Sequence, residues 1–273
     1  AKLALAQGQY EIAANRYFQA LVQVRGLPQQ RHFFLSGLRT LQAGNLLPQA
    51  VKAARQYGYP LRDDRETQLY LVKLCRAAGD LNEAERYARR LLQMALLREW
   101  QQLAQAEAGW RPVAFDGDKP PQAPFDQEAY LLGYEVMLGN RKLHDAFLIA
   151  ERAVKHAPDD LAWRKRLAQV AEWDQQPQIG LENWLLVARQ GGSKEAWEAV
   201  LRLAPGLTDD EALVAALEWD ARRQSPDPTR LAAVVATYER LGRVQDALAF
   251  LQARAGDKAP AEVLEALEQL AER

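Results

Sequence analysis

Cysteine and histidine are both scarce in this chain. Cys75 is the one cysteine among 273 residues, which excludes an intramolecular disulfide and fits either a cytosolic protein or an exported one whose core needs no covalent link. His32, His144 and His156 lie far apart and lack the spacing of metal ligands. The sequence also lacks a Gly-rich phosphate loop and a nucleophile elbow. We therefore expect no metal, no other cofactor and no enzymatic activity.

Long apolar runs and alternating strand patterns are absent too. No apolar stretch approaches the ~20 residues that a membrane-spanning helix needs. Residues 1–6 have the pattern of an amphipathic helix rather than a signal peptide, from which we expect a fragment of a longer helical array. Glycine and proline fall at intervals, whereas the good helix formers Ala, Leu, Gln, Glu and Arg dominate. These features predict an all-α protein.

The net charge of −1 hides an uneven distribution. Residues 1–100 contain 15 Lys and Arg against 8 Asp and Glu, whereas residues 101–273 contain 20 against 28. Such an asymmetry can steer charged partners, or it can reflect ordinary variation among solvated helix faces. The basic run Arg86, Arg89 and Arg90 leaves two interpretations open, a solvated face or a patch for an acidic partner. Because acidic residues interleave with basic ones, we expect no nucleic-acid partner.

Small residues recur at a nearly constant interval. They occupy positions 13, 50, 84, 146, 180, 212 and 247, and successive positions differ by 37, 34, 62, 34, 32 and 35. Small side chains along one stripe of a helix allow a second helix to approach closely. A helix pair of about 34 residues buries too little surface to be stable alone, so neighbouring pairs must complete the core.

The interval and its residues resemble the tetratricopeptide repeat. The fullest match consists of Leu132, Gly133, Gly139, Ala146, Ala150, Ala153 and Pro158. Gly8, Gly44, Gly79, Gly139 and Gly242 stand at the turns of their repeats, where a left-handed residue ends the first helix. Residues 159–160 (Asp-Asp) and 208–210 (Thr-Asp-Asp) are placed where helix N-termini need capping groups. We predict a right-handed α-solenoid of tetratricopeptide-like helix hairpins.

The one interval of 62 residues marks an interruption. We predict about three repeats in residues 1–94, the first truncated, an inserted helix and Pro-rich loop in 95–125, and about four repeats plus a terminal helix in 126–273. Residues 96–108 have a helical pattern, and the prolines of residues 116–124 exclude a helix there. We expect the array to continue across this segment.

Proteins built from such repeats bind partners on the inner face of their first helices. The repeat register assigns nine residues to that candidate partner-binding groove: Arg31, Lys73, Arg76, Tyr130, Tyr134, Lys165, Gln169, Trp173 and Arg240. Tyr130 and Tyr134 share a helix face, and with Trp173 they offer aromatic surface for direct carbohydrate contact.

One set of segments carries a closer resemblance. Residues 125–130, 171–174, 180–184 and 209–213 are similar to the periplasmic repeat region of the PelB family, the outer-membrane export proteins of the Pel exopolysaccharide system. The resemblance implies a periplasmic scaffold without catalytic activity. It also implies a partner, a PelA-like enzyme that deacetylates and hydrolyses the cationic polysaccharide. Gly180 in place of alanine, the short helix that ends near Pro205, and residues 95–125 depart from the family pattern.

Three hypotheses of function follow. The first is a scaffold that recruits the polysaccharide deacetylase/hydrolase, with the acidic residues of 101–273 helping to guide the cationic polysaccharide itself. The second is a cytosolic adaptor in which Lys73, Arg76 and Lys165 clamp the carboxylate of a peptide tail. The third is a module that contacts carbohydrate directly through the aromatic residues of the groove.

Overall fold

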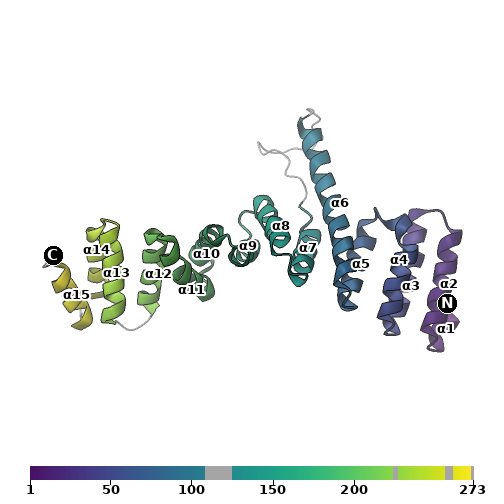
Figure 1. The fold of residues 1–273 in the computed structure, drawn as a ribbon, viewed down its shortest axis with the longest axis horizontal. Coiled ribbons are helices and arrows are strands. Elements are labelled where there is room, and N and C mark those ends of the chain that lie inside the picture. The colour runs from purple at the N-terminus through teal and green to yellow at the C-terminus, as the bar shows by residue number, and fades with distance from the viewer. Residues whose placement is uncertain (108–124, 224–226, 256–260, 272–273) are drawn as a thin grey trace. The chain divides into compact units, whose positions relative to one another are not determined.

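The computed structural model describes residues 1–107, 125–223, 227–255 and 261–271, and every regular element within them is helical. The predicted all-α class is therefore confirmed, with helices arranged as hairpins (Figure 1). The chain divides into two compact units, unit 1 of residues 1–156 and unit 2 of residues 157–273, which are described in turn. Within each unit, every helix packs against the helix that follows it in the chain.

Unit 1 is built from four successive helix pairs. Its elements are α1 (Lys2–Ala6), α2 (Tyr10–Gln23), α3 (Leu27–Ala43), α4 (Leu47–Tyr57), the 3-10 helix η1 (Tyr59–Leu61), α5 (Arg65–Ala77), α6 (Leu81–Glu107), α7 (Gln127–Gly139) and α8 (Leu143–His156). The odd-numbered helices are the first helices of their hairpins, and the even-numbered helices are the second.

Unit 2 contains three further pairs and a last helix in its described residues. Its elements are α9 (Leu161–Trp173), α10 (Pro177–Gly191), α11 (Lys194–Leu203), the 3-10 helix η2 (Pro205–Leu207), α12 (Asp210–Arg223), α13 (Pro228–Arg240), α14 (Val244–Ala255) and α15 (Ala261–Ala271). Helix α15 packs on both helices of the preceding hairpin, α13 and α14.

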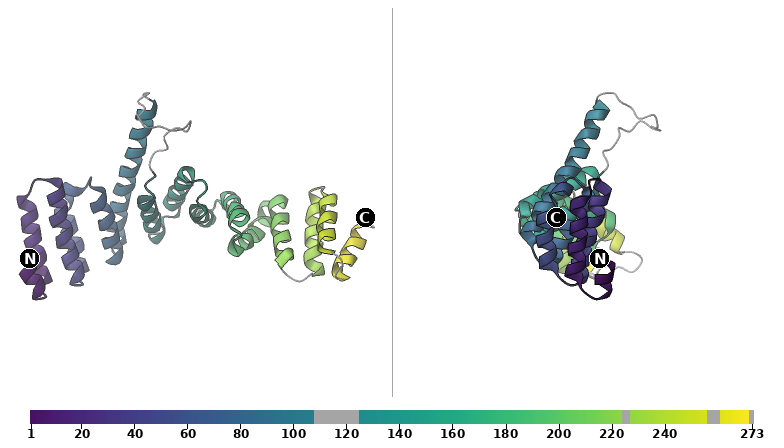
Figure 2. Two further views of the ribbon diagram at one scale, coloured as in Figure 1. Left: turned by 180° about the vertical axis from the view of Figure 1, so that it is seen from behind. Right: turned by 90° about the vertical axis from the view of Figure 1, so that its right-hand side faces the viewer.

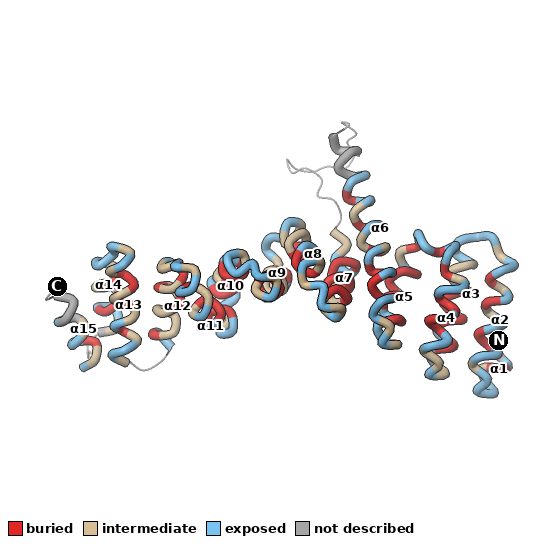
Figure 3. Tube along the Cα trace, viewed as in Figure 1, coloured by how far each residue is buried: buried red, intermediate tan, exposed pale blue. Residues whose placement is uncertain are grey.

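The small residues that define the repeat all lie on second helices, and buried stretches recur from helix to helix in each unit (Figure 3). Six of the seven are alanines with at most 1% of their surface exposed, and Gly180 is buried as well. Close approach also explains Gly133 of α7, because a Cβ atom added there would lie 2.8 Å from the Leu92 side chain of α6. Helices at this separation exclude larger side chains, which confirms the physical basis of the repeat register.

Each hairpin turn contains one residue in the left-handed region. Gly8, Gly79 and Gly242 have φ angles of 72°, 74° and 68°, as predicted. The prediction was wrong for Gly44 and Gly139, because the left-handed residue of their turns is Asn45 (φ 56°) and Arg141 (φ 58°). Gln175 (φ 60°) and Thr208 (φ 54°) take this position in two further turns. The turn geometry is therefore common to all seven described hairpins, although glycine marks it in only three of them.

Helix α6 differs from the predicted organisation of residues 95–125. It runs without a break from Leu81 to Glu107, so residues 96–107 extend a second helix and do not form a separate inserted one. The reason is that residues 94–96 include no glycine or proline, so nothing in the sequence ends the helix at residue 94. The extension projects beyond α5 and α7 (Figures 1 and 2). The Pro-rich loop lies outside the described residues, and α7 packs directly on α6 beyond it.

Aspartate side chains cap several first helices. Asp160 Oδ1 accepts hydrogen bonds from the backbone N–H groups of Ala162 (2.8 Å) and Trp163 (3.1 Å) at the start of α9. Asp209 Oδ1 accepts one from Ala212 (2.9 Å) at the start of the second helix α12. Capping by the predicted segments 159–160 and 208–210 is confirmed, with Asp160 and Asp209 as the residues that accept from backbone donors without a partner in the helix.

Cys75 is a core residue of α5. It is fully buried, and this burial raises the pKa of its thiol to about 12. The thiol is therefore protonated at neutral pH and packs as a small apolar group.

No helix in the part of the chain that the structure describes is long and apolar enough to cross a lipid bilayer.

Candidate functional site

The residues predicted to line a groove all lie on first helices. In unit 1 they are Arg31 on α3, Lys73 and Arg76 on α5, and Tyr130 and Tyr134 on α7; in unit 2 they are Lys165, Gln169 and Trp173 on α9, and Arg240 at the end of α13. Within unit 1 the basic members are accessible to solvent and the tyrosines are not. The two groups therefore have different roles.

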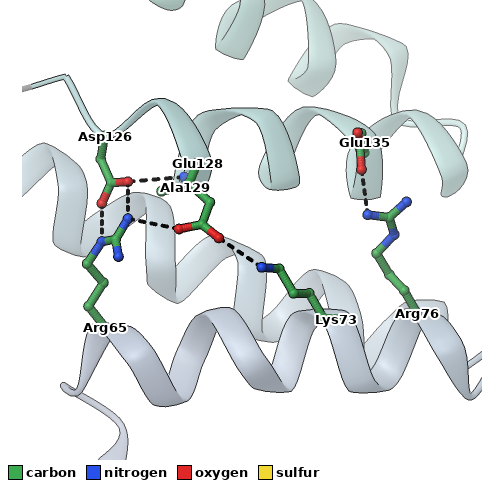
Figure 4. Close-up of polar contacts among 7 residues, drawn as sticks. All are labelled: Arg65, Lys73, Arg76, Asp126, Glu128, Ala129 and Glu135. Atoms are coloured by element: carbon green, nitrogen blue, oxygen red, sulfur yellow. Dashed lines mark hydrogen bonds and ion pairs between the residues drawn. The ribbon is translucent and has the colours of Figure 1, made fainter.

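Cations on α5 face carboxylates on α7, the first helix of the next hairpin (Figure 4). Lys73 Nζ lies 2.8 Å from Glu128 Oε1, and Arg76 Nη1 lies 2.5 Å from Glu135 Oε2. We call the set formed by Arg65, Lys73, Arg76, Asp126, Glu128 and Glu135 the first-helix charge ladder. It joins two consecutive hairpins along their first helices.

Arg65 makes the tightest contact of the ladder. Its Nε donates a hydrogen bond to Asp126 Oδ2 and its Nη2 donates one to Asp126 Oδ1, both at 2.5 Å. Nη2 also donates to Glu128 Oε2 at 3.5 Å. Asp126 in turn caps α7 by accepting a hydrogen bond from the backbone N–H of Ala129 (3.2 Å). This two-pronged geometry fixes the start of α7 against the start of α5.

These contacts shift the pKa values of three residues of the ladder. The hydrogen bond from Lys73 lowers the pKa of Glu128. For Asp126, burial raises the pKa, but hydrogen bonds from Arg65 and from the Ala129 N–H outweigh it and leave the pKa below its ordinary value. The hydrogen bond to Asp126 raises the pKa of Arg65. All three shifts favour the charged forms of Arg65, Asp126 and Glu128.

A similar contact joins the preceding pair of hairpins. Arg31 Nη1 on α3 donates to Glu66 Oε2 (2.7 Å) and to Asp64 Oδ1 (3.3 Å), and the buried Asp64 caps α5 through the backbone N–H of Thr67. In each case the cation belongs to the earlier hairpin and the anion to the later one. Part of the uneven charge of the sequence is thus balanced inside unit 1, across the boundary at residue 100.

The placement of Tyr130 and Tyr134 in an open groove was wrong. Their side chains share one face of α7 as expected, but that face is buried, with 1% and 4% of each residue exposed. The Tyr130 hydroxyl donates a 2.8 Å hydrogen bond to Glu99 on the extension of α6. Glu99 is itself buried and also binds Arg152 and His156 of α8. The sequence interpretation had assigned Glu99 to an insertion, but because α6 is unbroken, Glu99 lies beside α7 and accepts the hydrogen bond from Tyr130.

The predicted residues of unit 2 are partly engaged. Lys165 Nζ lies 2.6 Å from Glu195 Oε2 on α11, and Arg240 Nη2 lies 2.6 Å from Asp210 Oδ1 on α12. Gln169 is half-buried, whereas Trp173 is exposed over 47% of its surface. The sequence interpretation missed Glu172, which accepts hydrogen bonds from Arg202 of α11 and from the Trp184 indole of α10.

The structure does not leave the three predicted clamp residues free. Lys73, Arg76 and Lys165 each have a carboxylate partner on the next first helix. The acidic partners were missed because, in the ladder, they follow their cations by 55 to 61 residues rather than by one regular repeat. Among residues 1–107, 125–223, 227–255 and 261–271, no group of three or more His, Cys, Asp and Glu side chains is arranged to hold a metal ion.

Comparison with known proteins gives similarity at the level of solved structures. No protein-family model and no curated protein matches the sequence. The crystal structure of the MamA protein is 13% identical, with 76% of this chain and 94% of that chain covered and a TM-score of 0.40. YrrB, described as a TPR protein with an unusual peptide-binding site, is 15% identical, with 81% of this chain and 94% of that chain covered and a TM-score of 0.40. A tetratricopeptide repeat protein from Parabacteroides merdae is 10% identical, with 98% of this chain and 94% of that chain covered and a TM-score of 0.44. None of these points to the exopolysaccharide-export family.

Proposed function

We propose that the protein is a binding scaffold that holds a partner protein against the first-helix charge ladder of unit 1. The observation that carries this proposal is the half-exposed state of the ladder. The side chains of Lys73, Arg76, Glu128 and Glu135 are between 39% and 56% exposed although each has an ion-pair partner. These pairs fix the positions of the charges without covering them.

Such pairs keep unused hydrogen-bonding capacity. An ammonium group has three donors and a carboxylate has about four acceptor sites, whereas Lys73 and Glu128 spend only part of theirs on each other. A partner segment that carries both acidic and basic side chains can therefore add to the ladder without breaking it. Because the charges are already held in place, little side-chain entropy is lost on binding.

The resemblance of residues 125–130, 171–174, 180–184 and 209–213 to the exopolysaccharide-export family supports a more specific proposal. On this proposal the protein acts in the periplasm as part of an outer-membrane export system. Its partner is a PelA-like deacetylase/hydrolase that modifies the cationic polysaccharide before export. The scaffold would keep this enzyme close to its substrate and would itself perform no chemistry.

The proposal is tested with the purified deacetylase/hydrolase and this chain, by biolayer interferometry at low ionic strength. The double variant Lys73→Glu/Arg76→Glu is expected to bind about tenfold more weakly or worse, since like charges brought together cost several kcal/mol. The matched control is Lys52→Glu/Arg16→Glu, which reverses two exposed charges on second helices of unit 1. Equal losses in both double variants, or no binding by the parent chain, would overturn the proposal.

The two other hypotheses are less well supported. A peptide-tail clamp needs free cations, but Lys73, Arg76 and Lys165 are paired. The hypothesis of direct carbohydrate contact relied on three aromatic residues, of which Tyr130 and Tyr134 are buried in the core and Trp173 is exposed. Binding of the purified polysaccharide that is weakened by Trp173→Ala, in the absence of any protein partner, would favour the carbohydrate hypothesis over the scaffold.

A further inference from the structure

A second charged surface of unit 1 lies on the second helices, where α4, η1, α5 and α6 enclose a solvent-open pocket of about 590 Å³. Five arginines line it: Arg55, Arg62, Arg86, Arg89 and Arg90. Among the described residues of the lining there is no carboxylate. A pocket of this size fits one or a few side chains of a bound peptide.

The local sequence explains why so many guanidinium groups meet here. Arg86, Arg89 and Arg90 are spaced three and four residues apart, which places them on one face of α6. Arg55 comes from the last turn of α4, and Arg62 immediately follows η1. The basic run that left two interpretations open in the sequence therefore forms one wall of the pocket.

Two tyrosines orient the guanidinium groups. The guanidinium of Arg62 lies 4.5 Å from the ring centroid of Tyr59, and that of Arg86 lies 4.8 Å from the ring of Tyr87. Arg62 Nη1 also donates a hydrogen bond to the Tyr59 hydroxyl, and Arg86 Nη2 donates one to the Tyr87 hydroxyl (3.0 Å). Contact with the aromatic ring and its hydroxyl holds each guanidinium in place and leaves its other N–H groups for further partners. Tyr59 is itself 71% exposed, so it also offers apolar surface next to the charges.

One carboxylate of the chain itself already binds at this cluster. Asp63 accepts hydrogen bonds from both Arg62 and Arg90, and its side chain is 60% exposed. One negative charge is thus shared by two guanidinium groups. The Nε atom of Arg90 is buried and has no hydrogen-bond partner. Arg62 also donates to the Tyr59 hydroxyl and Arg90 to Gln93 Oε1 (3.4 Å), and with five N–H donors each the two arginines still have donors in excess of what these partners accept.

The remaining arginines have carboxylate partners outside the lining. Arg55 binds Asp80 and Glu83, and Arg86 also binds Glu83. Arg89 binds Glu85 and Asp145. These contacts keep the cations in place against mutual repulsion, while the wall that faces the pocket stays basic.

We propose that this pocket binds a carboxylate side chain from an acidic peptide segment of a partner protein, which takes the place of Asp63 between Arg62 and Arg90. A carboxylate is the group that the same two arginines already hold, and planar guanidinium groups match it with two parallel hydrogen bonds. An apolar residue next to the acidic one packs on the exposed ring of Tyr59. The site is separate from the first-helix charge ladder and does not depend on the partner proposed for it.

The test uses two fluorescein-labelled octapeptides and the whole chain, with anisotropy measured at low ionic strength. One peptide carries two aspartates that flank a phenylalanine, and the other has asparagines in their place. The acidic peptide is expected to bind at least about tenfold more tightly, and Arg62→Ala or Arg90→Ala should each weaken it about tenfold, the usual range for a hydrogen bond to a charged group. Arg16→Ala, which removes an exposed arginine of the second helix α2, is the control and should change nothing.

Asp63→Asn provides the decisive measurement. If Asp63 occupies the position of the ligand, its neutralisation should strengthen binding of the acidic peptide several-fold. Unchanged or weaker binding by this variant, with an unchanged melting temperature, would overturn the proposal, as would equal binding of the two peptides. Arg62→Lys keeps the charge without the planar fork and is expected to give intermediate affinity, which separates a loss of the site from a loss of folding.

Discussion

Unit 1 joins successive hairpins through buried carboxylates, whereas the ion pairs between hairpins of unit 2 use more exposed carboxylates and its described core contains three buried tryptophans. Of the described residues, Asp64, Glu85 and Glu99 are the buried acidic side chains, and all three are in unit 1, where each binds groups from a neighbouring hairpin. In unit 2, Trp184 and Trp197 belong to one apolar cluster that spans α9 to α12.

The repeat pattern therefore determines the positions at which helices approach each other, but it does not determine which side chains make the contacts between hairpins. The small residues of the second helices set the distance between hairpins in both units. Among the described residues, buried carboxylates occupy part of the remaining space only in unit 1, and buried tryptophans occupy part of it only in unit 2. Unit 1 should therefore respond more strongly to pH and salt, and unit 2 to the loss of side-chain volume.

The largest effect is expected from Trp163→Ala in unit 2. Trp163 is fully buried, and its truncation should cost about 3–5 kcal/mol of unfolding free energy, with little dependence on pH. The comparison is Trp100→Ala in unit 1, where the side chain is 66% exposed and the change should stay within about 0.5 kcal/mol. Urea denaturation followed by circular dichroism measures both, and similar losses would contradict the contrast.

A smaller effect is expected from acidification of unit 1. Burial raises the pKa of Glu85, but hydrogen bonds from Lys142, Arg89 and Asn140 outweigh it and lower the pKa to about 2. Because the folded pKa lies below the unfolded one, the stabilisation is complete above about pH 4.5 and is lost as the pH falls toward 2. The loss should be about 2 kcal/mol, allowing for solvent screening of Lys142 and Arg89.

Glu85→Gln is the variant that checks this assignment. Its stability should be lower than that of the parent chain at neutral pH and should approach it near pH 2, because the two chains then differ little in charge at this position. Chemical denaturation across that pH range supplies the measurement. A parallel shift of both curves, with the same acid dependence, would show that other carboxyls are responsible.

The turns offer a comparison of one position between the units. Arg141 in unit 1 and Gln175 in unit 2 both have positive φ angles, 58° and 60°, although neither is glycine. Relief of the left-handed strain should make Arg141→Gly and Gln175→Gly each more stable by about 0.5–1 kcal/mol. Gly79→Ala should be destabilised by a similar amount, and thermal melting of the three variants tests whether the turn geometry is common to both units.

The smallest effect is expected from a single pair of the charge ladder. A double-mutant cycle with Lys73→Ala and Glu128→Ala should give a coupling energy of about 0.2–1 kcal/mol, which decreases as salt is added. A coupling of several kcal/mol would mean that the ladder stabilises unit 1 and is not mainly a surface for binding.

The fold could be predicted from the sequence because its signals are local. Small residues such as Ala84 and Ala146 recur wherever two helices must approach closely, and Gly79 occupies a turn where a left-handed residue is required. The length of α6 could not be predicted in this way. A regular repeat ends its second helix after about 14 residues, and only the absence of a breaker after Met94 indicated that this one continues.

The site could be predicted only in part, because binding surfaces depend on contacts between hairpins. Lys73 and Arg76 lie on a first helix and are accessible, but their partners Glu128 and Glu135 follow across the one irregular interval. Tyr130 was misplaced for the same reason, since its acceptor Glu99 lies in the extension of α6. The basic excess before residue 100 and the acidic excess after it were the signal that could have revealed these pairs.

The buried thiol of Cys75 makes the surface of this protein unusually easy to label. With its one native sulfhydryl protonated and covered inside α5, the folded chain should react slowly with maleimides. A cysteine introduced at an exposed position, such as Lys52 or Lys73, would then be the single fast-reacting group. A fluorophore or cross-linker can thus be placed on either helix face of unit 1 without first removing a native residue.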